Sequence, residues 1–371
     1  MKRLVIVLCF ASGLGICAGW VGAQPPGHGK GHSGNLLMDL RDVLIVGAGP
    51  SGLATAIAAT KADLSYLILE KGALVNSLLH YPKHMVFFTT PELMEIGGLP
   101  FVSPNDKPSR MEALNYYRRA ADPYHLDIVF DERVLRIERE TIEPAVGPVF
   151  AIESRSKLGV RRVSHARTAV VATGAYDVAN MMGVPGEDLP HVSHYYTEPH
   201  PFYRKNVAIV GGKNSAAEAA LDLYRAGARV TIVHRGLAFG DSIKYWVKPD
   251  IENRVAEGSI AAKFNTSVVE ITPTAVVVDS AAGREEIPAD GVFLLTGYRS
   301  DPELLRNSRI EMDPATCGPV HDPQTFETNV PGLFVVGAVV AGTQSGRIFI
   351  ENGRFHGEVA IKGVLAHVRR A

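Results

Sequence analysis

The chain has 371 residues, a formal net charge of −1 and apolar residues at 46 % of its positions. This length and composition suit a soluble protein with two globular domains. A charge so close to zero offers no basic face to neutralise phosphates, so nucleic acid is not expected as a partner. The three cysteines, Cys9, Cys17 and Cys317, lie far apart, which excludes a disulfide framework and gives no metal-ligand spacing.

Residues 1–37 differ in composition from the rest of the chain. Lys2 and Arg3 precede an uncharged, mostly apolar run that ends in small residues at Ala23, as in a secretory signal. Residues 24–37 are rich in Pro, Gly and polar residues and are typical of a flexible linker. Two interpretations stay open: a genuine signal or membrane anchor, and an over-extended start ahead of Met38. The second is preferred and predicts a cytoplasmic protein, whereas the first predicts an exported or anchored one.

A first strand–turn–helix–strand unit begins directly after this leader. An apolar run at 43–46 leads into Gly47-Ala-Gly49-Pro-Ser-Gly52, a good helix former at 53–59 and a second strand at 65–69. In this motif the first glycine permits a tight turn, the second lets a pyrophosphate approach the backbone, and the third allows close helix packing. Glu70, at the tip of the second strand, is placed to bind ribose hydroxyls. The unit predicts a site for the adenosine half of a dinucleotide, here FAD.

A second unit of the same kind starts at Val207. A strand at 207–210 is followed by Gly211-Gly-Lys-Asn-Ser-Ala216, a helix at 218–225 and a strand at 229–233. The tip of that last strand, His234-Arg235, is basic and suits the 2′-phosphate of NADP, so NADPH is favoured over NADH. Lys213 stands where the motif has its middle glycine. Its side chain either crowds the pyrophosphate or contacts it through the ammonium group, and contact is preferred.

The remaining segments complete a split first domain. Val134 is expected to lie beside the adenine of the cofactor. Strands at 169–174, 291–297 and 328–337 end in small residues, and a helix is expected to start near Gly346 or Arg347. The predicted fold is α/β, with two Rossmann-like, three-layer dinucleotide-binding domains, the FAD domain being split around the NADPH domain. The expected division is 1–37 for the leader and linker, 38–200 and 298–371 for the FAD domain, and 201–297 for the NADPH domain.

Several longer strings are more specific than these motifs. They are His80-Tyr-Pro-Lys-His-Met-Val-Phe-Phe-Thr-Thr-Pro-Glu, Glu95-Ile-Gly-Gly-Leu-Pro-Phe101, His194-Tyr-Tyr, and Ile348-Phe-Ile-Glu-Asn-Gly-Arg354 with His356-Gly357. With them, from about Leu40 to the C-terminus, the chain resembles the thioredoxin-reductase-like flavoproteins and, among these, the bacillithiol-disulfide reductase family. The resemblance implies NADPH-driven reduction of a low-molecular-weight disulfide through FAD. That family is also similar at Lys213.

The chain departs from the pattern of this family at one informative position. The family typically has a cysteine in the first glycine loop, whereas this chain has Ser51, which cannot form a mixed disulfide. Residues 201–297 contain no cysteine, so the CxxC that thioredoxin reductases carry in this domain is absent. Cys317, the one thiol outside the leader, is interpreted as an incidental loop residue. These observations predict a reductase that works without its own dithiol.

Three functions remain open. The preferred one is an NADPH-dependent FAD oxidoreductase that reduces a small disulfide or a small redox protein. The second is a ferredoxin or flavodoxin–NADP reductase, or a flavin monooxygenase, although residues 192–200 lack the full FxGxxxH pattern of the monooxygenases. The third is a non-enzymatic flavin redox sensor. A homo-oligomer is expected.

No catalytic acid or base can be assigned, although His80, Tyr81, His84 and His356 lie in the family-like strings. The positions expected to bind FAD are Gly47, Gly49, Pro50, Ser51, Gly52, Glu70, Lys71, Val134, Thr173, Gly174, Gly337 and Ala338. Those expected to bind NADPH are Gly211, Gly212, Lys213, Asn214, Ser215, Ala216, His234 and Arg235.

Overall fold

The computed structural model describes residues 40–142, 147–344 and 346–369, and the leader interpretation therefore lies outside the described residues. The chain divides into the units Met1–Met38 and Asp39–Ala371, and the second contains every element described below. Two main sheets and two smaller ones make up this unit, and the predicted α/β class is confirmed.

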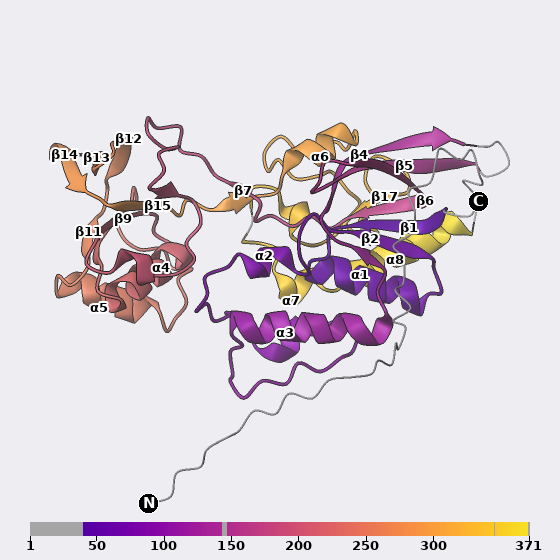
Figure 1. Cartoon of the computed structure of the whole chain (residues 1–371), viewed down its shortest axis with the longest axis horizontal. Coiled ribbons are helices and arrows are strands. Elements are labelled where there is room, and N and C mark those ends of the chain that lie inside the picture. The colour runs from indigo at the N-terminus through magenta and orange to yellow at the C-terminus, as the bar shows by residue number, and fades with distance from the viewer. Residues whose placement is uncertain (1–39, 143–146, 345, 370–371) are drawn as a thin grey trace, which may run out of the picture. The chain divides into compact units, whose positions relative to one another are not determined.

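The first sheet has the strand order β3-β2-β1-β6-β5-β4, and β17 also pairs with β6 (Figure 1). The pairs β1–β2, β1–β6, β2–β3 and β6–β17 are parallel, whereas β4, β5 and β6 form an antiparallel extension. Parallel strands bring their carboxyl ends to one edge, where β1, β6 and β17 each run into a glycine-containing loop. The strand bounds are β1 Arg41–Val46, β2 Tyr66–Leu69, β3 Ile128–Val129, β4 Glu132–Thr141, β5 Pro148–Ser156, β6 Arg161–Val171 and β17 Leu333–Val335.

Helices α1 (Pro50–Lys61) and α8 (His356–Val368) share one apolar core with β1 and β6. Pro50 opens α1, where its fixed φ suits the first helical turn. Helix α3 (Arg110–Ala121) begins with a capping box, because Ser109 and Glu112 bond each other's backbone N–H. The other helical elements of this part are α2 Asn76–Leu79, η2 Pro91–Met94, η3 Asp122–Tyr124, α6 Pro302–Asn307, η5 Gly337–Ala341 and α7 Ile350–Gly353.

The second sheet has the strand order β11-β10-β9-β15-β8 and is parallel throughout. Its core contains the alanine-rich face of α4 (Asn214–Arg225) and Ile251 of α5 (Lys248–Ala256). An antiparallel sheet of β12, β13 and β14 adjoins it, and η4 (His200–Phe202) precedes β9. The strand bounds are β8 Val192–Ser193, β9 Asn206–Val210, β10 Arg229–Val233, β11 Ala261–Lys263, β12 Ser267–Ile271, β13 Ala275–Ser280, β14 Gly283–Pro288 and β15 Gly291–Leu294.

The chain passes between the two main sheets through two short strands that pair with each other. β7 (Val178–Ala179) and β16 (Tyr298–Arg299) are antiparallel, with Tyr298 opposite Ala179. Next to this pair, the Asn180 N–H donates to the Gly297 carbonyl at 3.0 Å and the Thr296 hydroxyl donates to the Asn180 carbonyl at 2.7 Å. The outgoing and returning connections are therefore tied together.

One predicted element was misplaced. The helix expected near Gly346 or Arg347 begins at Ile350. The Asn352 carboxamide accepts from the Phe349 N–H at 2.8 Å and donates to the Arg347 carbonyl at 3.0 Å, which holds residues 347–349 in a non-helical approach. Among the helices in the described part of the chain, none has both the length and the apolar character needed to cross a membrane.

Candidate functional site

Two neighbouring cavities contain most of the positions expected to bind FAD. The first, of about 630 Å³, is lined by Gly47, Gly49, Pro50, Ser51, Glu70, Lys71, Thr173, Gly174, Gly337 and Ala338. The second, of about 570 Å³, shares Gly47, Glu70, Lys71 and Thr173 with the first and adds Val134. The shared walls join the two cavities into one site along the carboxyl edge of the first sheet.

The first glycine loop is closely packed at two positions and open at the third. A Cβ on Gly47, whose φ is +105°, would lie 2.7 Å from the Ala172 carbonyl oxygen. A Cβ on Gly52 would lie 2.0 Å from the Gly47 carbonyl oxygen. At Gly49 a Cβ would meet nothing within 4 Å. The loop therefore leaves free space at the one glycine that the motif reserves for a pyrophosphate, and the residues fit a dinucleotide.

Glu70 is tied to this loop through the backbone. The residue is 5 % exposed, and its two carboxyl oxygens accept the N–H of Ala48 at 2.7 Å and of Gly72 at 2.9 Å. Burial raises the pKa of Glu70, and the bonds from Ala48 and Gly72 oppose that rise. Because Glu70 lines both cavities, a carboxylate with remaining lone pairs faces the place where they meet.

Lys71 and Val134 both line the second cavity. The Lys71 ammonium forms an ion pair with Asp177 at 2.5 Å, which joins the tip of β2 to the loop after β6. Val134 is buried in β4, immediately before a register shift in the β4–β5 pair. Such a bulge bends a strand and re-aims its side chains. No local sequence pattern indicates this bulge.

The second glycine loop contributes only part of its predicted set to the first cavity. Asn214 and Ser215, at the start of α4, line the cavity, whereas Gly211, Gly212, Lys213, Ala216, His234 and Arg235 line neither of the two cavities. The Asn214 side chain is bonded to the segment after β10, since it donates to the Ser242 carbonyl at 2.8 Å and accepts the Lys244 N–H at 2.7 Å. The start of α4 is thus held by the 242–244 segment.

The two basic residues at the tip of β10 lie in different surroundings. The His234 ring is half-buried against Gly212 and Gly236, where an added Cβ would come within 2.4 Å and 2.6 Å of it. Burial, followed by the charge of Arg235, lowers the pKa of His234, so the ring is neutral at physiological pH. Arg235 is exposed. Of the two, Arg235 is the permanent cation available to a ligand.

Lys244 is a cavity residue that sequence reasoning missed. The residue is 5 % exposed, and its ammonium donates to the Glu218 carboxylate at 2.7 Å and to the Val86 carbonyl at 2.8 Å. Beside it, the Trp246 ring stacks on Phe88 with centroids 5.8 Å apart. The contacts with Val86 and Phe88 join residues more than a hundred positions apart in sequence, so no local pattern indicates them.

The four candidate proton carriers separate into two pairs. Tyr81 and His84 line the first cavity, whereas His80 and His356 do not. Burial raises the pKa of Tyr81 to about 12, which leaves its hydroxyl protonated at neutral pH. Tyr81 therefore cannot act as a base there, and His84 is the cavity histidine of the four.

The described cavity walls contain no thiol. Cys317 is exposed, has a φ of +52° and lies in a tight loop whose Cys317 N–H donates to the Asp313 carbonyl at 2.8 Å. It lines neither cavity. Across the described ranges, no group of three or more His, Cys, Asp or Glu side chains is arranged to hold a metal ion.

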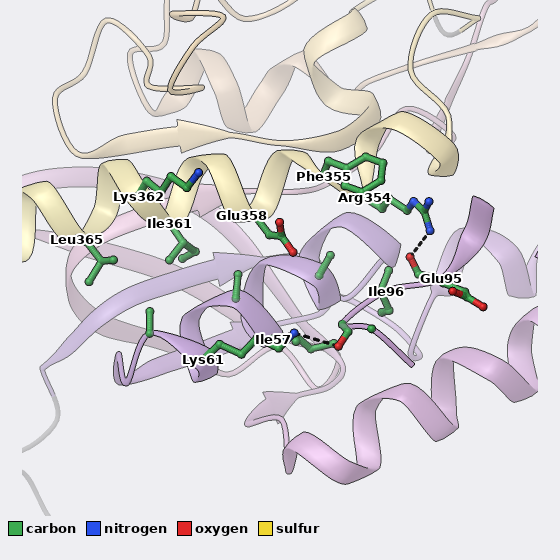
Figure 2. Close-up of a pocket in the computed structure, with 15 residues that line it drawn as sticks. Ile57, Lys61, Glu95, Ile96, Arg354, Phe355, Glu358, Ile361, Lys362 and Leu365 are labelled. Atoms are coloured by element: carbon green, nitrogen blue, oxygen red, sulfur yellow. Dashed lines mark hydrogen bonds between the residues drawn. The ribbon is translucent and has the colours of Figure 1, made fainter. Parts of the chain in front are cut away.

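Two of the family-like strings meet away from these cavities. A groove of about 420 Å³ runs between α1, α8 and residues 95–98 (Figure 2). Arg354 crosses one end of it and donates to the carbonyls of Glu92 at 2.8 Å and Glu95 at 2.7 Å. At the other end, the Lys61 ammonium donates to the Gly97 carbonyl at 3.0 Å. The strings 95–101 and 348–354 thus form one structural joint.

Comparison with known proteins gives this architecture its family. The model of a family described as pyridine nucleotide-disulphide oxidoreductase matches residues 44–337. The chain belongs to this family. Bacilliredoxin reductase Bdr from Bacillus subtilis (strain 168) is 41 % identical over 317 residues, which cover 85 % of this chain and 94 % of the relative.

Solved structures agree with this assignment. Bacillithiol disulfide reductase Bdr (YpdA) from Bacillus cereus has a TM-score of 0.84 and 38 % identity. The match covers 89 % of this chain and 99 % of the Bacillus cereus chain. The enzyme of the same name from Staphylococcus aureus has a TM-score of 0.82 and 36 % identity. That match covers 87 % of this chain and 98 % of the Staphylococcus aureus chain. The predicted resemblance to the bacillithiol-disulfide reductases is confirmed. The expectation that the chain is an oxidoreductase is confirmed with it.

Proposed function

We propose that this protein is an NADPH-dependent FAD oxidoreductase that reduces a low-molecular-weight disulfide of the bacillithiol type. The observation that carries the proposal is the site at the first glycine loop, with its open position at Gly49, in a chain 41 % identical to a bacilliredoxin reductase. The cofactors are FAD and NADPH. When bound, FAD supplies the acceptor for the hydride of NADPH and passes two electrons to the disulfide.

The proposed FAD contacts follow the two cavities. Gly49 leaves room for the pyrophosphate, Glu70 offers acceptors to ribose hydroxyls, and Val134 lies beside the adenine end. Thr173, Gly174, Gly337 and Ala338 line the larger cavity, which has room for the flavin ring. Gly47 and Gly52 also act in another way, since their missing side chains allow the loop to close.

The proposed NADPH contacts lie at the start of α4 and the tip of β10. Asn214 and Ser215 face the larger cavity, where nicotinamide would meet the flavin. Lys213, the N-cap residue of α4, is exposed, so its ammonium is available to a pyrophosphate. Exposed Arg235 is the proposed reader of the 2′-phosphate, and His234 supports the loop beneath it.

Reduction without a protein thiol follows from the cavity walls. The overall change, NADPH with one proton and a disulfide giving NADP⁺ and two thiols, balances without any cysteine of the chain. Ser51, at the family's cysteine position, lines the larger cavity but cannot carry a mixed disulfide. With FAD bound, the walls described here would hold the disulfide and orient it, but would offer no thiol as an intermediate electron carrier.

The decisive experiment is anaerobic reduction by NADPH followed by an acceptor panel. The panel contains bacillithiol disulfide, glutathione disulfide, ferredoxin, flavodoxin and oxygen. We expect rapid flavin bleaching and fastest reoxidation by bacillithiol disulfide, with turnover unchanged in Cys317→Ser. Preferred reoxidation by ferredoxin, flavodoxin or oxygen contradicts the disulfide assignment, and slow bleaching with no turnover indicates a redox sensor.

Domain division, location and assembly are part of the same proposal. We keep the FAD domain at 38–200 and 298–371 and the NADPH domain at 201–297, with one refinement. Because β8 pairs with β15, the insertion is better started between β7 and β8. A cytoplasmic homo-oligomer suits a soluble reductase of this kind, and size-exclusion chromatography with light scattering tests the assembly.

A further inference from the structure

A stack of three rings lies behind the cavity wall at Gly337. The rings of His356 and Phe326 are stacked with centroids 4.2 Å apart and an interplanar angle of 20°. Phe326 in turn stacks on His321 at 5.7 Å and 16°. Phe326 adopts a φ of +61°, which is uncommon for a residue with a bulky side chain, and its carbonyl accepts the N–H of Val335 in β17. The stack is therefore built onto the strand that leads to Gly337.

Gly337 is fixed from several directions. Its N–H donates to Nδ1 of His356 at 3.2 Å. Its φ of +76° and a hypothetical Cβ only 2.5 Å from the Ser51 Oγ leave no place for a side chain. The preceding residue, Val336, donates to the Val171 carbonyl at 2.9 Å. The first glycine loop, the end of β17 and the start of α8 thus converge on one peptide that lines the larger cavity.

The His356 ring is held in the form that this bond requires. Burial lowers the pKa of His356 to about 4, and the neighbouring His321 contributes in the same direction. A neutral imidazole that accepts through Nδ1 carries its hydrogen on Nε2. The Gly337 N–H therefore bonds to an imidazole that remains neutral at physiological pH.

We propose that His356 is a positioning residue for FAD, because its Nδ1 holds the Gly337–Ala338 wall at its spacing from Ser51 and so sets the width of the flavin cavity. The inference rests on the proposed function, since it places the flavin in this cavity. It differs from a general packing role in one respect. A packing role needs only the volume and stacking of the ring, whereas positioning needs an acceptor at the Nδ1 position.

Two amide variants of the full chain separate these roles. His356→Asn puts its carboxamide oxygen close to the position of Nδ1 and keeps an acceptor for the Gly337 N–H. His356→Gln puts the oxygen near the position of Nε2 and loses that acceptor. We expect the FAD dissociation constant to rise about tenfold in H356Q, as for one lost hydrogen bond, and to stay within about threefold of the parent in H356N. The flavin midpoint potential should shift in H356Q only.

The control is His321→Ala, which removes the outer ring of the stack and leaves the Gly337 bond in place. Its FAD affinity and midpoint potential should match those of the parent. Equal affinity and potential in H356Q and the parent overturn the inference. Equal loss in H356Q and H356N, through misfolding or flavin release, also overturns it, because acceptor position then has no effect. A parent protein that binds no FAD contradicts the proposed function instead.

Discussion

The two glycine loops begin with the same constraint and then diverge. Gly47 and Gly211 both have positive φ, and a Cβ on either would lie 2.7 Å from a carbonyl oxygen at the end of a neighbouring strand, that of Ala172 or Leu295. At the third motif position the first loop requires Gly52, whereas the second loop accommodates Ala216 in the same place. The first loop is therefore tighter where its helix begins.

The strand tips beside the loops differ in a related way. Glu70 reaches back and accepts the Ala48 N–H inside the first loop, whereas the His234 ring fills the space beside Gly212 in the second. The first loop is held by a hydrogen bond to a buried carboxyl group, and the second by the volume of a neutral ring. Shared motif spacing thus reflects shared chain geometry, while the means of fixing each loop is particular to it.

Substituting the open glycine should have the largest effect. Gly49→Val places a branched side chain where a pyrophosphate must approach, although a Cβ meets no protein atom within 4 Å. We expect the purified variant to lack FAD while its fold, followed by circular dichroism and thermal unfolding of the FAD-free protein, remains like that of FAD-free parent. Full flavin occupancy in this variant would falsify the assignment of the first loop.

The third motif position separates the two loops by stability. Gly52→Ala puts a Cβ 2.0 Å from a backbone oxygen, so α1 must shift, at a cost of about 3 kcal/mol in unfolding free energy. Its counterpart, Ala216→Gly, should cost about 1 kcal/mol, the ordinary helix penalty of glycine. Urea unfolding measures both. Similar losses at the two positions would show that the loops are equally tight.

Removing the exposed guanidinium of Arg235 tests whether the positive charge at the tip of β10 binds the 2′-phosphate of NADPH. Arg235→Ala should weaken NADPH binding by about ten- to a hundredfold, the value of one charged hydrogen bond, and change NADH binding little. Titration of both nucleotides by calorimetry gives the ratio. His234→Ala is the matched comparison, and it should weaken the two nucleotides alike, because His234 supports the loop. An equal loss of both nucleotides in Arg235→Ala refutes its role as phosphate reader.

The smallest effect concerns the pH dependence of the first tip. Since burial raises the pKa of Glu70 above its ordinary value of 4.5, the folded FAD-free protein holds this proton more tightly than the unfolded chain. The contribution of Glu70 to stability is thus fully present below pH 4.5 and declines as pH rises through the folded pKa. Unfolding of parent and Glu70→Gln across this range should show the decline in the parent alone. A steeper decline in Glu70→Gln would contradict it.

The sequence was sufficient to predict those elements whose structure depends on residues close together in the chain. The runs β1–α1–β2 and β9–α4–β10 were predicted from apolar periodicity and glycine spacing, and both helices begin a few residues earlier than expected. The antiparallel extension β4–β5–β6, the Lys244 contacts and the His356 bond were not predicted. Each depends on residues that become neighbours only after folding. The predicted start of the helix at α7 was wrong, because the Asn352 side chain bonds to residues 347 and 349 and holds them outside the helix.

The paired strands β7 and β16 have a consequence for how such a protein can be rebuilt. Since Val178 and Arg299 lie opposite each other, the chain leaves the first sheet and returns to it at a single point. The residues between them behave as a cassette with adjacent ends, and exchanging a cassette of this kind leaves the order of strands in the host sheet untouched. Since Asn214, Ser215 and Lys244 of this cassette also line the larger cavity, a transplanted cassette would carry nucleotide preference together with one wall of the flavin site.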